Sequence, residues 1–364
     1  MSIFASVKEF IAPGSVSRTS IPPFEAALRA NSKLDEAQLV LESAEHEPNS
    51  IVAIGGNSFR FSSGNSVFSY DGDVVTEQVR FDGSAGSLER IGADTVVAVE
   101  GRGLVLLDDA GNTTDLCTDD AVKSCITDLA AGPEGELYAT VGSRHLNIKQ
   151  WSRSLLEADR SGQLVRVGGT KVTTLLSGLA WPAGVLIDPS DPRRIVVSSS
   201  NDHRIYTGQV GAASLDPLTS ELPFYPGRLR GADDGGYWVA APYVRNRFTE
   251  LMLTDAGFTR EMMATIDPDE WLVPRLRSDR PHAAALQVGQ IRVLGVLKPW
   301  APARSYGLVA HIERGGRFDF SAHSRADGDV HGITDVAVSG PGQVLLAGQG
   351  CRNLVPVELD EGAQ

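Results

Sequence analysis

The sequence predicts an all-β protein, a six-bladed β-propeller, from three observations. Short strand-like segments alternate with Gly, Asp and Pro turns along nearly the whole chain, which is the pattern of a β-meander. One unit of three or four such strands recurs six times. Four-stranded units repeated around an axis describe a propeller, because each sheet then buries both faces against its neighbours and leaves few edges exposed.

Each unit contains a strand, a Gly/Asp/Pro turn, a second strand, a short polar turn and a third strand that ends near Asp or Gly. A fourth strand follows most of the units. The six units cover residues 50–72, 87–111, 128–169, 178–211, 227–316 and 332–359.

The ends of the chain suggest how the ring closes. The last unit reaches the C-terminus without a fourth strand, while AQLVLESA (37–44) precedes the first unit and has no partner. We therefore expect this segment to supply the outer strand of blade six, in a propeller domain that covers 31–364. Residues 1–30 form an N-terminal extension that the repeat does not explain.

Composition restricts the class of partner. The chain has 364 residues, 42% hydrophobic and 22% charged, with a formal net charge of -13. An acidic surface disfavours nucleic acid and anionic membranes, so a small-molecule substrate is the expected partner. Neither a leader-like segment nor a long apolar stretch occurs, which predicts a cytoplasmic protein of undetermined oligomeric state. Cys117, Cys125 and Cys351 fit neither a disulfide framework nor a zinc site and are expected to be buried hydrophobic residues.

The repeat also predicts where a site would lie. Consecutive antiparallel strands reverse direction, so the starts of the six inner strands and the turns between second and third strands meet at one mouth of the central channel. The inner-strand starts bring to this mouth Glu47, Ser87, Asp128, Ala183, Gly227 with Arg228, and His331. The turns add Asn65, Glu100, Arg102, Asn201, Asp202, His203 and Arg352.

Two turns at this mouth are enlarged, at about 143–161 in blade three and 242–304 in blade five. Long ordered insertions usually serve as lids or binding loops. They carry Trp151 and Trp300, for which both ligand stacking and core packing are open, and Tyr306 follows with a hydroxyl that could face the channel.

Several segments resemble a known family. The residues that carry the resemblance include GRGLVLLDDAG, GLAWPAGVLID, LPFYPGRLRGADDGGYWVAAP and HSRADGDVHGITDV. From about residue 33 to 358 the chain resembles the strictosidine synthase-like branch of the gluconolactonase and senescence marker protein superfamily of six-bladed propellers. The resemblance implies that fold and, for the lactonases, one divalent metal at the channel mouth.

The metal ligands that the resemblance implies are only partly present. Glu47 and Asp128 match two ligand positions, but Ala183 stands where blade four should offer Asn and Gly227 where blade five should offer Asp. A methyl group and a bare glycine cannot ligate a hard cation, which takes about six or more oxygen ligands as calcium. The neighbouring Arg228 would repel a cation and attract an anion. No cofactor is therefore expected, and calcium fits this set poorly.

The same positions supply catalytic candidates. Glu47, His331 and Asp128 are predicted to move protons, while Arg228 neutralises an anionic substrate or pairs with an internal carboxylate such as Glu47. Structural roles stay open for each: His331 as a strand cap, Glu47 as a hydrogen-bond acceptor, and Asp128 as an acceptor from backbone amides. Predicted substrate-binding residues are Arg228, Trp151, Trp300, Tyr306 and His203, the last also explicable as a turn residue.

Together these residues predict a hydrolase that opens a lactone or ester of a small anionic or sugar-like molecule. Two alternatives remain. One is a metal-free lyase or condensing enzyme resembling strictosidine synthase, and the other is a non-catalytic propeller that binds a small molecule.

Overall fold

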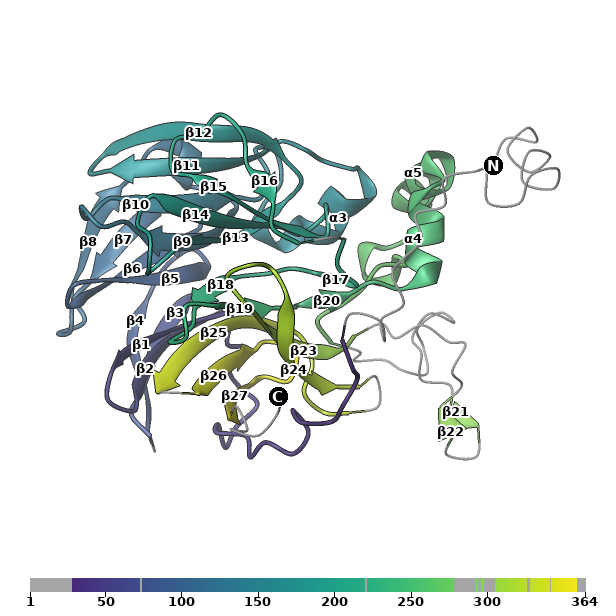
Figure 1. The fold of residues 1–364 in the computed structure, drawn as a ribbon, viewed down its shortest axis with the longest axis horizontal. Coiled ribbons are helices and arrows are strands. Elements are labelled where there is room, and N and C mark those ends of the chain that lie inside the picture. Colours follow the sequence, from purple (N-terminus) through teal and green to yellow (C-terminus); the bar gives the residue numbers. More distant parts are fainter. Residues whose placement is uncertain are drawn as a thin grey trace.

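Six sheets surround a central channel, which confirms the six-bladed β-propeller (Figure 1). The computed structural model describes residues 28–72, 74–219, 221–277, 305–325, 328–340 and 342–358, and the backbone of two short strands, β21 (Arg292–Val293) and β22 (Val296–Leu297).

Blades one to three are antiparallel sheets of four strands in chain order. In blade three an insertion separates the second strand from the third. Blade one consists of β1 (Ser50–Gly55), β2 (Ser58–Ser63), β3 (Ser66–Tyr70) and β4 (Val75–Arg80); blade two of β5 (Ala85–Ile91), β6 (Asp94–Val99), β7 (Gly103–Leu107) and β8 (Thr113–Cys117); blade three of β9 (Ile126–Ala131), β10 (Leu137–Val141), β11 (Gly162–Gly168) and β12 (Lys171–Leu179).

Blades four to six follow the same plan, with a shorter fourth strand in blade four and three strands in blade six. Blade four consists of β13 (Pro182–Ile187), β14 (Arg194–Ser199), β15 (Arg204–Gln209) and β16 (Asp216–Pro217); blade five of β18 (Leu229–Gly231), β19 (Tyr237–Ala240), β23 (Gly307–Ile312) and β24 (Phe318–Ser324); blade six of β25 (Ile333–Gly340), β26 (Gln343–Gly348) and β27 (Asn353–Glu358).

The inner strands form a closed ring. β1 contacts β5, and the contacts continue through β9, β13, β18 and β25 back to β1. Apolar clusters fill the spaces between neighbouring blades: Val52 of blade one packs with Leu88 and Val97 of blade two, and Phe59 of blade one packs with Leu345 of blade six. Because both faces of a blade are covered, strands such as β6 (DTVVAV) are nearly continuous apolar runs.

The ring does not close through the regular strand expected at 37–44. This segment is irregular, although it runs along β27, where the Val40 amide donates to the Leu354 carbonyl (3.1 Å). The Asn353 side chain then accepts from the Leu41 amide (2.7 Å) and donates to the Leu41 carbonyl (2.8 Å). A side-chain amide thus takes the place of one backbone pair. Leu41 of this segment and Leu34, which precedes it, are buried.

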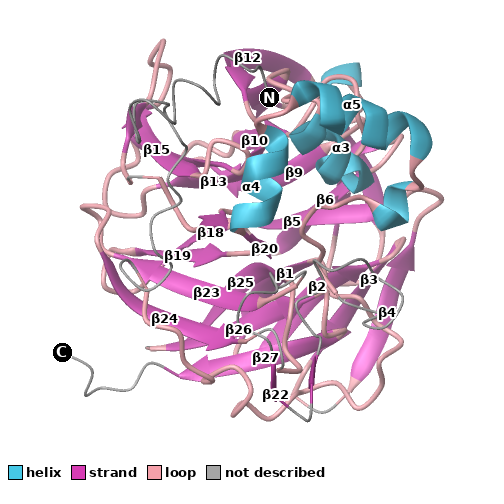
Figure 2. Cartoon of the chain, turned by 90° about the vertical axis from the view of Figure 1, so that its right-hand side faces the viewer, coloured by secondary structure: helices cyan, strands magenta, loops and turns pink. Residues whose placement is uncertain are grey.

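Both insertions place helices on one face of the propeller, where Figure 2 shows α3, α4 and α5 together. The first insertion contains η2 (Ile148–Gln150) and α3 (Trp151–Leu156), and a capping box between Asn147 and Gln150 begins η2. The remaining elements are η1 (Asp120–Val122), β17 (Phe224–Tyr225), β20 (Tyr243–Val244), α4 (Arg247–Leu253), α5 (Ala256–Thr265) and η3 (Pro268–Glu270).

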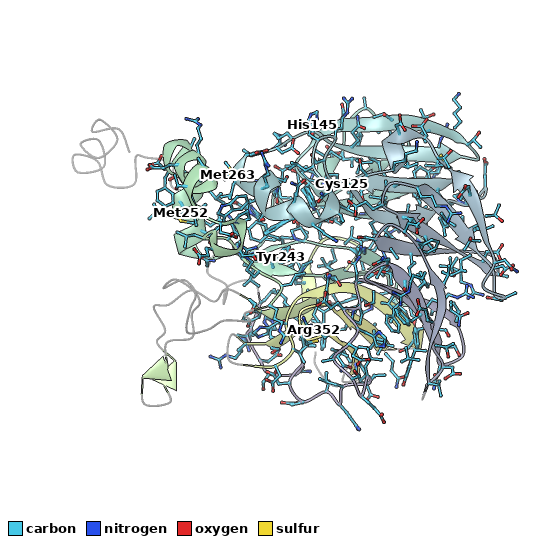
Figure 3. The ribbon with its side chains drawn as sticks, turned by 180° about the vertical axis from the view of Figure 1, so that it is seen from behind. Cys125, His145, Tyr243, Met252, Met263 and Arg352 are labelled. Carbon is cyan, nitrogen blue, oxygen red and sulfur yellow. The ribbon has the colours of Figure 1, made fainter. Side chains whose placement is uncertain are left out.

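Trp271, which follows η3, belongs to one apolar cluster with Met262 of α5 and Trp151 of α3, and this cluster joins the two insertions. Figure 3 marks Met252 of α4 and Met263 of α5 beyond the edge of the sheets. Among the helices of the described residues, none has the length and apolar character needed to cross a membrane.

The Asn353 contact provides a test of ring closure. We expect Asn353→Ala to lower the free energy of unfolding by about 1–3 kcal/mol, because the buried backbone groups of Leu41 then lose their partners. Glu358→Ala, at the exposed end of the same strand, is the matched control. Denaturant melts of the two variants check this, and equal stability would show that the contact with Leu41 does not hold the ring.

Candidate functional site

A cavity of about 770 Å³ opens on the helical face of the propeller. Inner-strand starts of different blades line its floor, as the strand directions require, and the third and fifth blades add residues of their insertions. The floor residues are Asn49, Ala85, Thr127, Ala183, Gly227, Arg228 and Thr334. The predicted mouth is therefore a cavity large enough for a small molecule.

One wall of the cavity is aromatic. Trp151 of α3 stacks on Tyr243 of β20, with ring centroids 3.8 Å apart and an interplanar angle of 13°. The indole nitrogen of Trp151 donates to Ser200 Oγ (3.3 Å), which fixes the ring. Trp181, at the start of blade four, lines the same wall. This wall can hold the flat or apolar part of a ligand.

The lining of the cavity includes strained backbone. Among the described residues, Cys125 and Trp181 have positive φ angles of 54° and 50°, and both line the cavity. A bulky residue in this region is uncommon and concentrates at functional sites. Trp181 is held there by close packing on Gly142, where an added Cβ would lie 3.0 Å from the indole ring. Burial raises the pKa of the Cys125 thiol to about 12, so this thiol is not a nucleophile at neutral pH.

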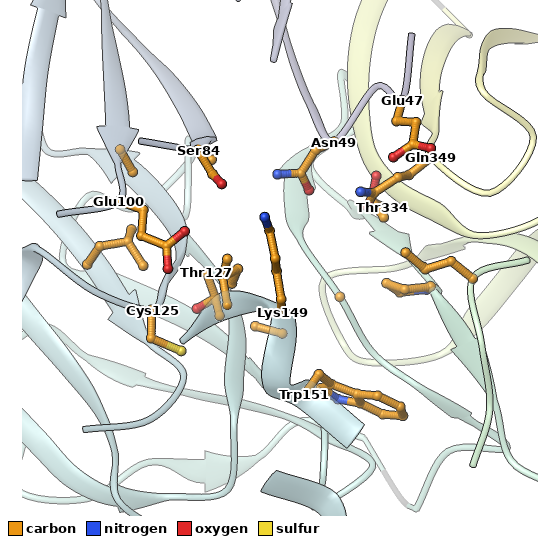
Figure 4. Close-up of a pocket in the computed structure, with 18 of the residues that line it drawn as sticks. Glu47, Asn49, Ser84, Glu100, Cys125, Thr127, Lys149, Trp151, Thr334 and Gln349 are labelled. Carbon is orange, nitrogen blue, oxygen red and sulfur yellow. The ribbon is translucent and has the colours of Figure 1, made fainter. Parts of the chain in front are cut away.

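Another part of the lining, the polar wall, carries two charged side chains of opposite sign. Glu100 comes from the turn between β6 and β7, and Lys149 comes from η2 of the first insertion. Figure 4 shows the Glu100 carboxylate and the Lys149 side chain directed into the same space, with Asn49 and Ser84 beside them. Within the described part of the chain, neither charge has a hydrogen bond or an ion pair of its own.

The backbone at Glu100 is fixed. Its amide donates to the Ser84 carbonyl (3.0 Å), and the amide of Gly101 donates to the Lys123 carbonyl (2.7 Å). Gly83 is required at the base of this turn, because an added Cβ would lie 2.0 Å from the Glu100 carbonyl oxygen. A half-buried carboxylate is thus held at a defined place with free oxygens.

The floor is held by a guanidinium group. Arg228 donates from Nε to the Thr127 carbonyl (3.0 Å) and from Nη1 to the carbonyls of Asn49 (2.5 Å) and Thr334 (3.2 Å). It therefore joins the inner-strand starts of blades three, one and six. Its side chain is 7% exposed, which favours a structural role in the floor over binding of an anionic substrate.

Beneath Arg228 lies a buried ion quartet, which we define as Arg228, Arg230, Asp128 and Asp335. Arg230 makes a bidentate pair with Asp128 (2.9 and 3.0 Å) and a further bond to Asp335 (2.9 Å). Arg228 Nε lies 3.6 Å from Asp128 and 4.0 Å from Asp335. The two positive and two negative charges balance within the channel.

The quartet reaches every blade. Asp335 accepts from Ser50 Oγ (2.7 Å) of blade one, and Asp128 accepts from Ser87 Oγ (3.0 Å) of blade two and the Val185 amide (3.1 Å) of blade four. This placement does not support the predicted role of Asp128 as a catalytic residue or metal ligand, because its oxygens are fully buried and taken up by Arg230 and these donors. The alternative, an acceptor from a backbone amide, agrees with the bond to Val185.

Glu47 and His331 occupy different surroundings. Glu47 lines the rim of the cavity but is exposed and pairs with Arg352 (2.9 Å), so it is not the partner of Arg228. His331 is buried outside the cavity, with Nδ1 2.8 Å from Ser305 Oγ and Nε2 2.9 Å from the Arg325 carbonyl. Both ring nitrogens are engaged, which favours the strand-capping role over that of a general base.

Of the predicted substrate-binding residues, some line the cavity and others lie away from it. Trp151 lines the cavity, whereas Tyr306 is buried away from it with its hydroxyl 3.1 Å from His323 Nδ1. Trp300 lies outside the described residues. His203 is buried in a turn with φ 55°, and burial together with Arg245 lowers its pKa to about 3. His203 is therefore neutral at physiological pH and acts as a turn residue beneath the second insertion.

The residues at the mouth do not fit the metal that the resemblance implies. Ala183 and Gly227 line the cavity without offering side-chain oxygens, and Arg228 already takes the carbonyl oxygens of Thr127 and Asn49. A side chain at 227 would also require a shift, since its Cβ would lie 2.8 Å from Pro242 Cδ. A hard cation finds too few oxygen ligands here.

A substitution in the quartet distinguishes a structural Arg228 from a substrate-binding one. We expect Arg228→Met to lower the free energy of unfolding by about 3–5 kcal/mol, because it leaves buried carboxylates and carbonyls undercompensated. Arg166→Met, an exposed arginine of β11, is the control. Urea denaturation measures the difference. If the variant kept its stability but lost ligand binding, Arg228 would be a substrate-binding residue and not a structural one.

Glu89 of β5 also bears on the channel and gives a pH test. Burial, aided by the charges of Asp128 and Asp335 and opposed by Arg230, raises the pKa of Glu89 from 4.5 to about 7. A raised carboxyl pKa means that stability from this group is greatest below 4.5 and is lost as pH rises toward 7.

Consequently, Glu89→Gln should match the wild type near pH 5 and exceed its stability near pH 8, as measured by urea denaturation across this range. A difference in unfolding free energy that stays constant with pH would contradict this expectation.

Comparisons with known proteins place this geometry in context. No family model matches the chain. It is 31% identical over 157 residues to strictosidine synthase-like protein 7 of Arabidopsis thaliana, a match that covers 42% of each chain and so less than half of that relative's length. It is 24% identical over 287 residues to the adipocyte plasma membrane-associated protein of Rattus norvegicus, covering 70% of this chain and 76% of that protein.

Solved structures share the fold at low sequence identity. Regucalcin of Agrobacterium tumefaciens, described as a calcium-binding protein, aligns with a TM-score of 0.54 and 13% identity over 90% of this chain and 93% of that chain. A gluconolactonase of Xanthomonas campestris aligns with a TM-score of 0.55 and 11% identity, over 90% and 92%. These matches and the ring of six blades confirm the resemblance to the strictosidine synthase-like branch of the gluconolactonase and senescence marker protein superfamily.

Proposed function

We propose that this protein is a hydrolase that opens a lactone or ester of a small molecule, using its own side chains at the mouth in place of a metal. The observation that carries the proposal is the pair of free charges, Glu100 and Lys149, which face one space on the polar wall. The gluconolactonase named above supports the reaction class through its fold.

The two side chains suit the two tasks of hydrolysis. The Glu100 carboxylate takes a proton from water as its oxygen attacks the carbonyl carbon. The Lys149 ammonium donates to the oxyanion that forms. As the bond to the leaving oxygen breaks, Glu100 returns its proton to that oxygen, which leaves a carboxylic acid and an alcohol.

The shape of the cavity bears on the substrate. The stacked Trp151 and Tyr243 line the same cavity as Glu100 and Lys149, so a ligand that carries an apolar ring beside its ester or lactone group contacts both pairs. This favours a substrate with an apolar ring, which differs from the anionic or sugar-like molecule that the sequence predicts.

Substitution of Glu100 tests the proposal. We expect Glu100→Gln to reduce kcat by about 100-fold to 10,000-fold with the melting temperature unchanged, because the amide cannot accept the proton. The assay follows hydrolysis of dihydrocoumarin, phenyl acetate and glucono-δ-lactone, with and without EDTA. Glu134→Gln, an exposed turn residue of blade three, is the control. Full activity of Glu100→Gln would overturn the proposal.

Lys149 is tested separately. We expect Lys149→Met to reduce kcat by roughly 100-fold to 1,000-fold, the usual effect of losing one oxyanion donor, and to leave stability unchanged. Lys171→Met, an exposed lysine of β12, is the control. Saturable binding of these compounds with no turnover in any variant, wild type included, would instead indicate a non-catalytic binding protein.

A further inference from the structure

A second cluster of polar side chains lies in blade five, at the end opposite the cavity. Asp234 belongs to the turn between β18 and β19, His311 lies near the end of β23, and Asp319 lies near the start of β24. β18 starts at the mouth, so this turn marks the far end of the channel. Ligand-type atoms of the three residues all lie within 4.8 Å of one another.

His311 is the centre of this cluster. It is 2% exposed, and its Nδ1 lies 2.7 Å from Asp319 Oδ1. Its Nε2 lies 3.3 Å from Asp234 Oδ1, yet this buried nitrogen has no hydrogen-bond partner among the described residues. A buried polar atom without a hydrogen bond is costly, so its persistence calls for a ligand.

The imidazole cannot easily turn away. Its ring packs edge-on against Trp238, with centroids 5.1 Å apart and an interplanar angle of 62°. Gly236 lies so close that an added Cβ would be 2.7 Å from Nε2. Asp234 is also fixed, because one of its oxygens accepts from the Gly236 amide (2.8 Å). Both groups are therefore held facing each other.

Space is present at the same place. A cavity of about 120 Å³, lined by Asp234, His311 and Trp238, lies between the turns of blades five and six, where Gln343 and Val344 close its other side. This volume holds a cation with a few waters. The side chain of Asp234 is 62% exposed, so the cluster is open to solvent through it.

We propose that this cluster binds a divalent transition-metal ion of the zinc class, with His311 Nε2 and an Asp234 carboxylate oxygen as protein ligands. Asp319 accepts the proton of Nδ1, which leaves the lone pair on Nε2 and fixes the ring, as carboxylates do for metal-bound histidines. An imidazole nitrogen favours zinc, nickel or copper over calcium and magnesium, which prefer oxygen ligands. Water completes the coordination.

This site is independent of the proposed hydrolysis. It belongs to the opposite end of the propeller from Glu100 and Lys149 and shares no residue with the larger cavity. Metal bound here would tie the turn between β18 and β19 to β23 and so stabilise blade five.

The experiment uses the full chain, stripped with EDTA and dialysed. Zinc chloride is titrated by calorimetry into the wild type and into His311→Gln, Asp234→Asn and Asp319→Asn. His145→Gln, an exposed histidine of the first insertion, is the matched control. We expect one zinc ion per chain, raised melting temperature on binding, and loss of this binding in the first two variants.

Asp319→Asn separates orientation from ligation. It should weaken zinc binding by roughly 10-fold to 100-fold while one equivalent still binds, as for loss of a carboxylate that orients a ligand. Cobalt in place of zinc should give visible absorption that disappears in Asp234→Asn. Because Asp234 is exposed, misfolding of this variant would not explain that loss. The proposal would be wrong if the wild type did not bind zinc, or if the wild type and Asp234→Asn bound it equally. The cluster would then be a histidine that contacts two carboxylates without a metal.

Discussion

The ion quartet in the channel is the interaction on which the rest of the structure depends. Six sheets meet along an axis where inner strands present polar groups to one another, and an unpaired buried charge there would be costly. Arg228 and Arg230 balance Asp128 and Asp335, and the remaining bonds of these groups run to residues of all six blades. The paired charges of the quartet let the ring close around buried ionised groups.

The quartet also decides what chemistry the mouth can carry. Arg228 binds the carbonyl oxygens at the starts of blades one, three and six, so these oxygens are already engaged. A tethered guanidinium therefore holds the floor together in the place of an exchangeable ion. Under the proposed function, the reactive charges are those of the rim, where Glu100 and Lys149 remain without partners in the described structure.

The fold could be predicted from the sequence because Gly, Asp and Pro turns mark the ends of the strands in every repeat. The alternating directions of these strands also predicted which residues reach the mouth of the channel. Glu100 was among these rim residues, but its turn gave no reason to prefer it over its neighbours. The quartet has a signal in the sequence: ITD occurs at both Asp128 and Asp335, and an Arg-x-Arg pair places Arg228 just before β18 and Arg230 within it. No sequence signal marked Lys149, because the path of an insertion depends on packing between residues far apart in sequence.

The division between axis and rim explains why the chemistry of such a fold is hard to infer from its strands. Residues of the axis touch several blades at once, so a change there alters the stability of the whole ring. Glu100 and Lys149 touch little besides the cavity, and Lys149 belongs to an insertion that packs outside the sheets. Substitutions at the rim can therefore change the reaction at small cost to folding, and fold alone does not fix function. Under the proposed function, the charges of Glu100 and Lys149 at the rim are the part of the molecule that determines the reaction.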